Sequence, residues 1–303
     1  MRIAIIGGRG LIGFALAKEL RSAGHEPMLL SRKAERSQAI QGIPLIAWDG
    51  RDPLALAAIL DGMDGLVNLA GESIGKSPWT KKRIQTIVDS RLVPAYAVVE
   101  AWSKMKSPPS VLIQASAMGI YGPSDQPVDE HSPLGNGFLA DLCKNWESST
   151  AAVTQYQTRH VIIRSGLVLD RKQGILPQMM LPFRLFAGGP IGKGSQWMSW
   201  IHITDEARAI RYLLENEQSV GAYNLTTPNP VTNANFGKEI AKTLHRPYWF
   251  WIPGFLLKLV LGEMSSLLLE GQKVFPTRLV GEGFSFLYPD LAYALAGLLD
   301  STQ

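Results

Sequence analysis

Short apolar runs alternate with amphipathic stretches through the first half of the chain. Each apolar run has the length of a buried strand, so strands are predicted at residues 2–6, 28–30, 44–48, 65–70, 110–115 and 160–164. Helices are predicted from residue 11 to a C′ glycine at 24, and over residues 54–60, 81–102 and 138–154. This alternation predicts an α/β fold, a doubly wound parallel sheet with right-handed crossovers and helices on both faces.

The pattern changes after residue 164. Residues 174–194 are rich in Gly, Pro and Met, and we expect an irregular excursion over the carboxyl edge of the sheet. Long loops of this kind are often functional. Strands are predicted at 198–203 and 222–225, and Thr204 is the expected N-cap of a helix over 204–216. From residue 232 to about 299 the pattern is helical and apolar.

Composition narrows the class of protein. With 303 residues and 46% apolar content the chain can bury a large core, as one α/β domain or as two lobes. The net charge of +4 is mild and spread out, so we expect no nucleic-acid partner. A single cysteine, Cys143, excludes an intrachain disulfide and fits a reducing compartment. Because the first strand begins at residue 2, we expect no signal peptide and a cytoplasmic protein.

The most apolar region covers residues 248–269. Pro253, Lys258 and Glu263 interrupt it, so it lacks the run of about 18 apolar residues that a transmembrane helix needs. We expect a core or interface helix here rather than membrane contact. No His or Cys cluster has the spacing of metal ligands, and we expect no metal.

Three glycines directly follow the first predicted strand. Gly7, Gly10 and Gly13 lie at three-residue spacing before an amphipathic helix that begins with Leu11 and Ile12. Gly7 permits the tight turn, Gly10 lets a pyrophosphate approach the backbone, and Gly13 lets helix and strand pack closely. The free N–H groups at the start of the helix face the anion. The stretch therefore predicts a dinucleotide site; the alternative is a tight turn without a ligand.

The end of the second strand predicts which dinucleotide binds. Proteins that prefer NAD place a carboxylate there for the ribose 2′-hydroxyl, whereas this chain has Ser31, Arg32 and Lys33. A hydroxyl followed by cations suits a 2′-phosphate, and Arg9 in the glycine loop can reach the same group. We therefore predict NADP(H) as the cofactor. The alternative is a solvated basic loop.

Further cofactor contacts are expected where the next strands end. Asp49 can accept a hydrogen bond from the adenine amino group, or it can cap a turn with Gly50, and the sequence leaves both open. After the strand at 65–70, the expected contacts are Leu69, Ala70, Gly71 and Glu72. For Glu72, an ordinary loop carboxylate is an equal alternative.

Several motifs occur in order along the chain. The glycine triplet, Asn68-Leu69-Ala70-Gly71, residues 115–122 (ASAMGIYG) and Trp200-Ile201-His202-Ile203-x-Asp205 together resemble the extended short-chain dehydrogenase/reductase superfamily. Gly71-Glu72-Ser73, Asp89-Ser90-Arg91, Trp146-Glu147 and the Gly-Gly-Pro at 188–190 resemble its atypical sugar-nucleotide-epimerase-like branch. The resemblance implies a Rossmann domain from residues 1–165 and 198–228. It also implies a smaller, mostly helical substrate lobe from residues 166–197 and 229–303.

The catalytic motif departs from that family. Typical members carry Tyr-x-x-x-Lys, in which the Tyr is the acid/base and the Lys binds the nicotinamide ribose. Here Lys144 matches the Lys, but Ala140 stands in the Tyr position. Ser116 resembles the family serine but lies one residue early, with Ala117 in register. The standard redox triad therefore cannot be carried over.

Four residues remain as catalytic candidates, and three of them have a structural alternative. Ser116 leads because it follows a strand at the cofactor edge, and Lys144 is expected to contact the ribose unless it is a solvated helix lysine. For Tyr121 a structural role beside a Gly-Pro turn is favoured, and for His202 a hydrogen-bonded core histidine. Cys143 is expected to be a buried, inert thiol.

Two functions fit these observations. The first is an NADP(H)-dependent oxidoreductase or epimerase-like enzyme acting on a small polar substrate, with a sugar nucleotide as one class. The second is an NADP(H)-binding sensor or scaffold that has lost catalysis, which the missing Tyr favours. The sequence leaves the oligomeric state open, a homodimer included.

Overall fold

The computed structural model describes residues 1–32 and 38–299. Within them the largest sheet has eight strands, in the order β12-β8-β6-β5-β1-β2-β4-β3. Every neighbouring pair is parallel except β3 and β4. The strands are β1 (Arg2–Ile6), β2 (Glu26–Ser31), β3 (Gln38–Ile40), β4 (Ile43–Ala47), β5 (Gly65–Asn68), β6 (Val111–Ala117), β8 (Arg159–Ser165) and β12 (Gly221–Leu225).

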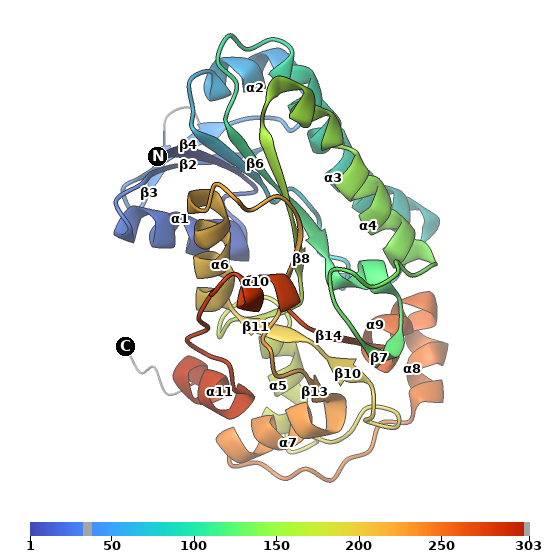
Figure 1. Cartoon of the computed structure of the whole chain (residues 1–303). Coiled ribbons are helices and arrows are strands. Elements are labelled where there is room, and N and C mark those ends of the chain that lie inside the picture. The colour runs from blue at the N-terminus through green and yellow to red at the C-terminus, as the bar shows by residue number, and fades with distance from the viewer. Residues whose placement is uncertain (33–37, 300–303) are drawn as a thin grey trace.

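Helices cover both faces of this sheet (Figure 1). α1 (Leu11–Ser22) and α6 (Ile203–Glu215) pack together on one face. The other face carries α2 (Pro53–Leu60), α3 (Lys81–Trp102) and α4 (Phe138–Ser148). Local signals set the helix starts: Asp52 and Thr80 accept backbone N–H groups as N-caps of α2 and α3. The predicted Rossmann-type doubly wound fold is thus confirmed.

The rest of the described chain forms smaller elements, and several of them surround a second apolar core. Leu176, Met180, Trp200, Phe236 and Leu295 are among its buried residues. The helices are α5 (Leu176–Arg184), α7 (Asn233–Thr243), α8 (Gly254–Leu261), α9 (Ser266–Leu269), α10 (Thr277–Gly281) and α11 (Leu291–Leu299). Three two-stranded sheets join β10 (Trp197–Met198) to β13 (Val231–Thr232), β11 (Trp200–His202) to β9 (Leu167–Leu169), and β14 (Gln272–Val274) to β7 (Ser124–Val128).

Several predicted elements differ from the structure. The helix predicted at 138–154 ends at Ser148, and a 3₁₀ helix follows at Ala151–Tyr156, because Thr150 turns inward to hydrogen-bond His160 of β8. The strand predicted at 198–203 is divided at Ser199, whose hydroxyl donates to Gln272 and accepts from the Val274 N–H. The short strands β3, β7, β9, β13 and β14 were not predicted.

The excursion predicted at 174–194 contains a helix, α5. Its prolines and methionines conceal an amphipathic pattern in which Leu176, Met180 and Phe183 face the core. Pro177 lies in the first turn, where a missing N–H costs no intrahelical bond. Thr204 is not the N-cap of α6; His202 holds that position instead.

Candidate functional site

The glycine loop has the shape of an anion cradle at the start of α1. Gly7 has a positive φ of 77°, and a Cβ there would lie 2.8 Å from the Leu69 carbonyl oxygen. A Cβ on Gly13 would lie 2.7 Å from the Gly7 oxygen, so only glycine permits this approach of helix to turn. The N-cap is Gly10, which has no side chain, and the first turn of α1 carries no acid. The loop therefore leaves the positive end of the helix open to a diphosphate.

The cradle lies at the point where the strand order reverses. β1 has β2 on one side and β5 on the other, so β2 and β5 end beside the glycine loop. The Leu69 N–H donates to the Ile6 oxygen over 3.0 Å, which holds the segment after β5 against this loop. Ligands of open α/β sheets bind at such a switch point. The predicted cofactor contacts Leu69 and Ala70 therefore lie beside the glycine loop, and their contact with a cofactor remains a prediction.

Arg32 begins the segment after β2 and lies near a carboxylate. Its Nη2 is 3.7 Å from Glu72 Oε1, and its side chain is 65% exposed. Glu72 also accepts from Arg83 Nη1 over 3.1 Å, and this hydrogen bond is the main cause that lowers the pKa of Glu72. Ser31 is the last residue of β2. The predicted contact Lys33 and the nearby Arg36 lie outside the described residues.

Asp49 forms a turn. Its Oδ1 accepts from the N–H groups of Arg51 (2.8 Å) and Asp52 (2.9 Å), and these bonds lower the pKa of Asp49. This is the turn-capping alternative. The contact of Asp49 with adenine remains a prediction.

A buried polar network lies at the carboxyl end of β6. Ser116 Oγ donates to Glu147 Oε1 over 2.7 Å. Arg164 grips the same carboxylate with Nε and Nη2, each at 2.9 Å. Arg164 Nη1 also donates to the Tyr121 hydroxyl, which in turn donates to Asn224 Oδ1 over 2.7 Å. Ser116 and Tyr121, two of the predicted candidates, are therefore joined through a buried ion pair.

This network favours the structural interpretation of Tyr121. Its ring is buried, its hydroxyl has partners on two strands, and burial raises its pKa. Glu147, Arg164 and Asn224 were missed as members of the site. The pair Trp146-Glu147 was one of the motifs that carried the family resemblance. A sequence motif does not show which cation will pair with a buried carboxylate.

The inner face of α4 carries small groups, with Ala140 in the position of the usual Tyr. Ala140 is buried, and the Cys143 thiol lies beside Ser116. Burial raises the pKa of Cys143 to about 11, which fits the inert thiol expected. Lys144 points instead to Asp141, with Nζ 3.2 Å from its Oδ1. The ribose contact of Lys144 remains a prediction.

His202 caps a helix. Its Nδ1 accepts the Thr204 N–H over 3.1 Å, and its ring stacks on Tyr288 with centroids 3.8 Å apart. Burial lowers its pKa to about 4, which outweighs the opposing effect of Asp205. The ring is therefore neutral near pH 7. This geometry favours the core-histidine interpretation over proton donation.

One fully buried carboxyl lies next to the end of β8. Ser165 Oγ donates to Glu206 Oε1 over 2.6 Å, and Glu206 Oε2 has no partner among the described residues. Burial raises the pKa of Glu206 to about 8.

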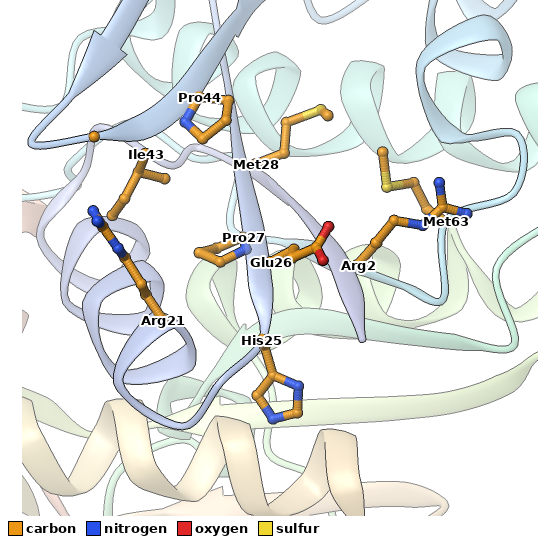
Figure 2. A pocket seen from close by; sticks show the side chains of 10 residues that line it. Arg2, Arg21, His25, Glu26, Pro27, Met28, Ile43, Pro44 and Met63 are labelled. Atoms are coloured by element: carbon orange, nitrogen blue, oxygen red, sulfur yellow. The ribbon is translucent and has the colours of Figure 1, made fainter.

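A hollow of about 300 Å³ lies at the opposite edge of the sheet. Figure 2 shows Arg2, Arg21, His25 and Glu26 around it, at the amino ends of β1 and β2. It is remote from the glycine loop, because parallel strands present their carboxyl ends at the other edge. We assign it no part in cofactor binding.

Comparison with known proteins identifies the family of the chain. Residues 3–226 match the model of the NAD dependent epimerase/dehydratase family. The chain belongs to this family. Residues 252–298 match a further model, described as a domain of unknown function, DUF1731.

Relatives extend along the whole chain. Epimerase family protein YfhF of Bacillus subtilis (strain 168) is 40% identical over 304 residues, which cover 99% of this chain and 98% of YfhF. The crystal structure of human epimerase family protein SDR39U1 (isoform 2) with NADPH has a TM-score of 0.90 and 36% identity, covering 99% and 100% of the two chains. The nucleoside-diphosphate sugar epimerase from Corynebacterium glutamicum has a TM-score of 0.79 and 32% identity, covering 99% of this chain and 58% of that one.

In the part of the chain that the structure describes, no helix is long and apolar enough to span a bilayer.

Proposed function

We propose that this protein is an NADP(H)-dependent oxidoreductase or epimerase-like enzyme that acts on a small polar substrate, with nucleotide sugars as the class to test first. The glycine cradle together with Arg32 at the end of β2 is the observation that carries the proposal. The human relative solved with NADPH and the nucleoside-diphosphate sugar epimerase from Corynebacterium glutamicum both support it.

The residues around the cradle fit the parts of NADP(H). In this proposal the N–H groups of Leu11 and Ile12 bind the diphosphate, and Gly7, Gly10 and Gly13 leave room for it. The 2′-phosphate lies against Arg32, with Arg9, Ser31 and Lys33 as further contacts. Asp49 approaches the adenine, and residues 69–72 line the opposite side. Lys144 reaches the nicotinamide ribose after it leaves Asp141.

The chain must also move a proton without the usual tyrosine. Bound NADP(H) supplies or accepts the hydride. Ser116 donates its own hydrogen to Glu147, so its oxygen lone pairs can accept a hydrogen bond from a substrate hydroxyl. A proton leaving the substrate then passes to Ser116 as the Ser116 proton passes to Glu147. We therefore propose Ser116 as the first catalytic candidate, ahead of Tyr121 and His202.

The second candidate function is an NADP(H)-binding sensor without turnover. Two observations favour it: the buried Ala140 in the Tyr position and the Lys144–Asp141 contact.

Calorimetric titration with NADPH and NADH, followed by NADPH turnover assays on a panel of carbonyl compounds and nucleotide sugars, separates the two functions. Turnover that Ser116→Ala reduces at least tenfold, with NADPH affinity unchanged, supports the enzyme. Tight NADPH binding without turnover on any compound supports the sensor. If neither NADPH nor NADH binds, both candidate functions are contradicted.

A further inference from the structure

A large apolar surface lies outside the cofactor site. Six of its side chains are more than half exposed, and we call them the aromatic face: Phe186, Trp249, Trp251, Phe255, Leu259 and Val260. Leu259 is 81% exposed and Trp249 is 71% exposed. Helix α8 has no buried residue at all. Of the core or interface helix expected at 248–269, α8 therefore excludes the core alternative. Large exposed apolar surfaces often mark interaction sites.

The two chain segments that carry this face run side by side. The backbone N–H of Phe250 donates to the Gly188 oxygen over 3.0 Å, and Ile252 forms a parallel bridge with Ile191. The indole N–H of Trp249 donates to the Phe186 oxygen, and that of Trp251 donates to the Gly192 oxygen. The only polar atom of each tryptophan side chain is thus satisfied within the protein. What the two rings offer outward is apolar surface.

Charge around the aromatic face is mainly positive, although Glu263 is exposed just after α8. Residues 171–204 and 240–262 contain no Asp or Glu. The same stretches contain seven cationic residues, Arg171, Lys172, Arg184, Lys193, Lys242, Arg246 and Lys258. All seven are exposed, and the Arg246 guanidinium lies 4.7 Å from the centroid of the Phe186 ring. Arg246 and Lys258 therefore place positive charge beside the apolar side chains of this face.

We infer that the aromatic face docks onto an anionic phospholipid surface. Tryptophan side chains are enriched at the level of the lipid headgroups, because they are amphipathic. Lys and Arg side chains are attracted by anionic lipids. A second copy of the chain fits less well, because two identical cationic faces would repel each other across a symmetric interface. In Figure 1, α8 lies at the side of the molecule, in the half away from α2.

The test is co-sedimentation of the full chain with large unilamellar vesicles. One set contains phosphatidylcholine alone, and the other contains equal parts of phosphatidylcholine and phosphatidylglycerol. We expect binding to the anionic vesicles to be at least tenfold stronger and to weaken as salt rises. Tryptophan fluorescence should shift to the blue on binding, since Trp249 and Trp251 leave water.

Variants assign the binding to this face. Leu259→Ser should lower the partition coefficient about tenfold, from the lost apolar surface. Lys258→Gln should lower it about fivefold, as expected for one cation near an anionic surface. The matched control is Leu54→Ser on α2, which is 65% exposed and should change nothing. Thermal melting by circular dichroism verifies that each variant is folded, and α8 contributes no buried side chain that the substitutions would remove.

Three outcomes would overturn the inference. The first is no binding to anionic vesicles, or equal binding to both sets. The second is an equal loss in Leu54→Ser and Leu259→Ser. The third is a dimer in sedimentation velocity that Leu259→Ser dissociates, because a second copy would then cover the face.

Discussion

Replacing Arg32 with alanine should alter cofactor choice while leaving the fold intact. A charge-assisted hydrogen bond contributes about 1.5–3 kcal/mol. The Arg32 side chain is 65% exposed, and Glu72 Oε1 at 3.7 Å competes for it, so solvent screening reduces this contribution. We expect a loss of about 1.4 kcal/mol, which corresponds to about tenfold weaker NADPH binding. NADH has no 2′-phosphate, and its affinity should stay unchanged.

The assay is a paired calorimetric titration of wild type and Arg32→Ala with NADPH and NADH, at low and high salt. The difference between the cofactors should shrink as salt rises, because the charges are at the surface. Lys104→Ala is the matched control: it removes one exposed cation just after the end of α3, at the edge of the sheet opposite the cradle. Equal affinity of the wild type for both cofactors, or an equal loss for both in Arg32→Ala, would refute the reasoning.

Three further predictions concern Gly10, Glu147 and Glu206. Gly10→Val should abolish dinucleotide binding in calorimetry with the fold retained, because a side chain there fills the space of the pyrophosphate; unchanged affinity would contradict the cradle. Glu147→Gln should lower the free energy of unfolding in urea by about 3–5 kcal/mol, since it leaves the buried Arg164 without its carboxylate, and a loss below 1 kcal/mol would contradict a buried pair. Burial raises the folded pKa of Glu206 from 4.5 to about 8, so stability should fall as pH rises from about 4.5 and should level off near pH 8. Urea unfolding between pH 6.5 and 8.5, above the titration of His202, should show this slope in the wild type and lose it in Glu206→Gln.

Much of the fold follows from patterns a few residues long. The strand at residues 2–6 and the helix at 81–102 have the predicted bounds. Their signals are local, namely a short apolar run before a glycine turn and an amphipathic stretch that begins after the cap Thr80. Alternation of such units also predicted the parallel sheet, because short connections leave few topologies. The tight turn predicted at Gly7 and the close helix–strand packing predicted at Gly13 likewise agree with the close backbone contacts of these glycines.

The roles of the polar candidates depended on residues far away in the chain. The hydroxyl of Tyr121 meets Asn224, 103 positions later, and Ser116 meets Glu147, 31 positions later. His202 is the reverse case, since its capping bond is to the nearby Thr204, but the pattern favoured Thr204 because hydroxyl side chains are the usual caps.

The sequence by itself determined the strand–glycine–helix unit, the order of the main elements and the basic end of β2, because each depends on neighbouring residues. Only the tertiary structure decided that Glu147 and Arg164 join Ser116 to Tyr121, that α5 replaces a loop, and that α8 remains exposed. These features arise from contacts between distant segments. Hydrophobic periodicity shows that a face is apolar, but what covers that face is settled by which segments the folded chain brings against it.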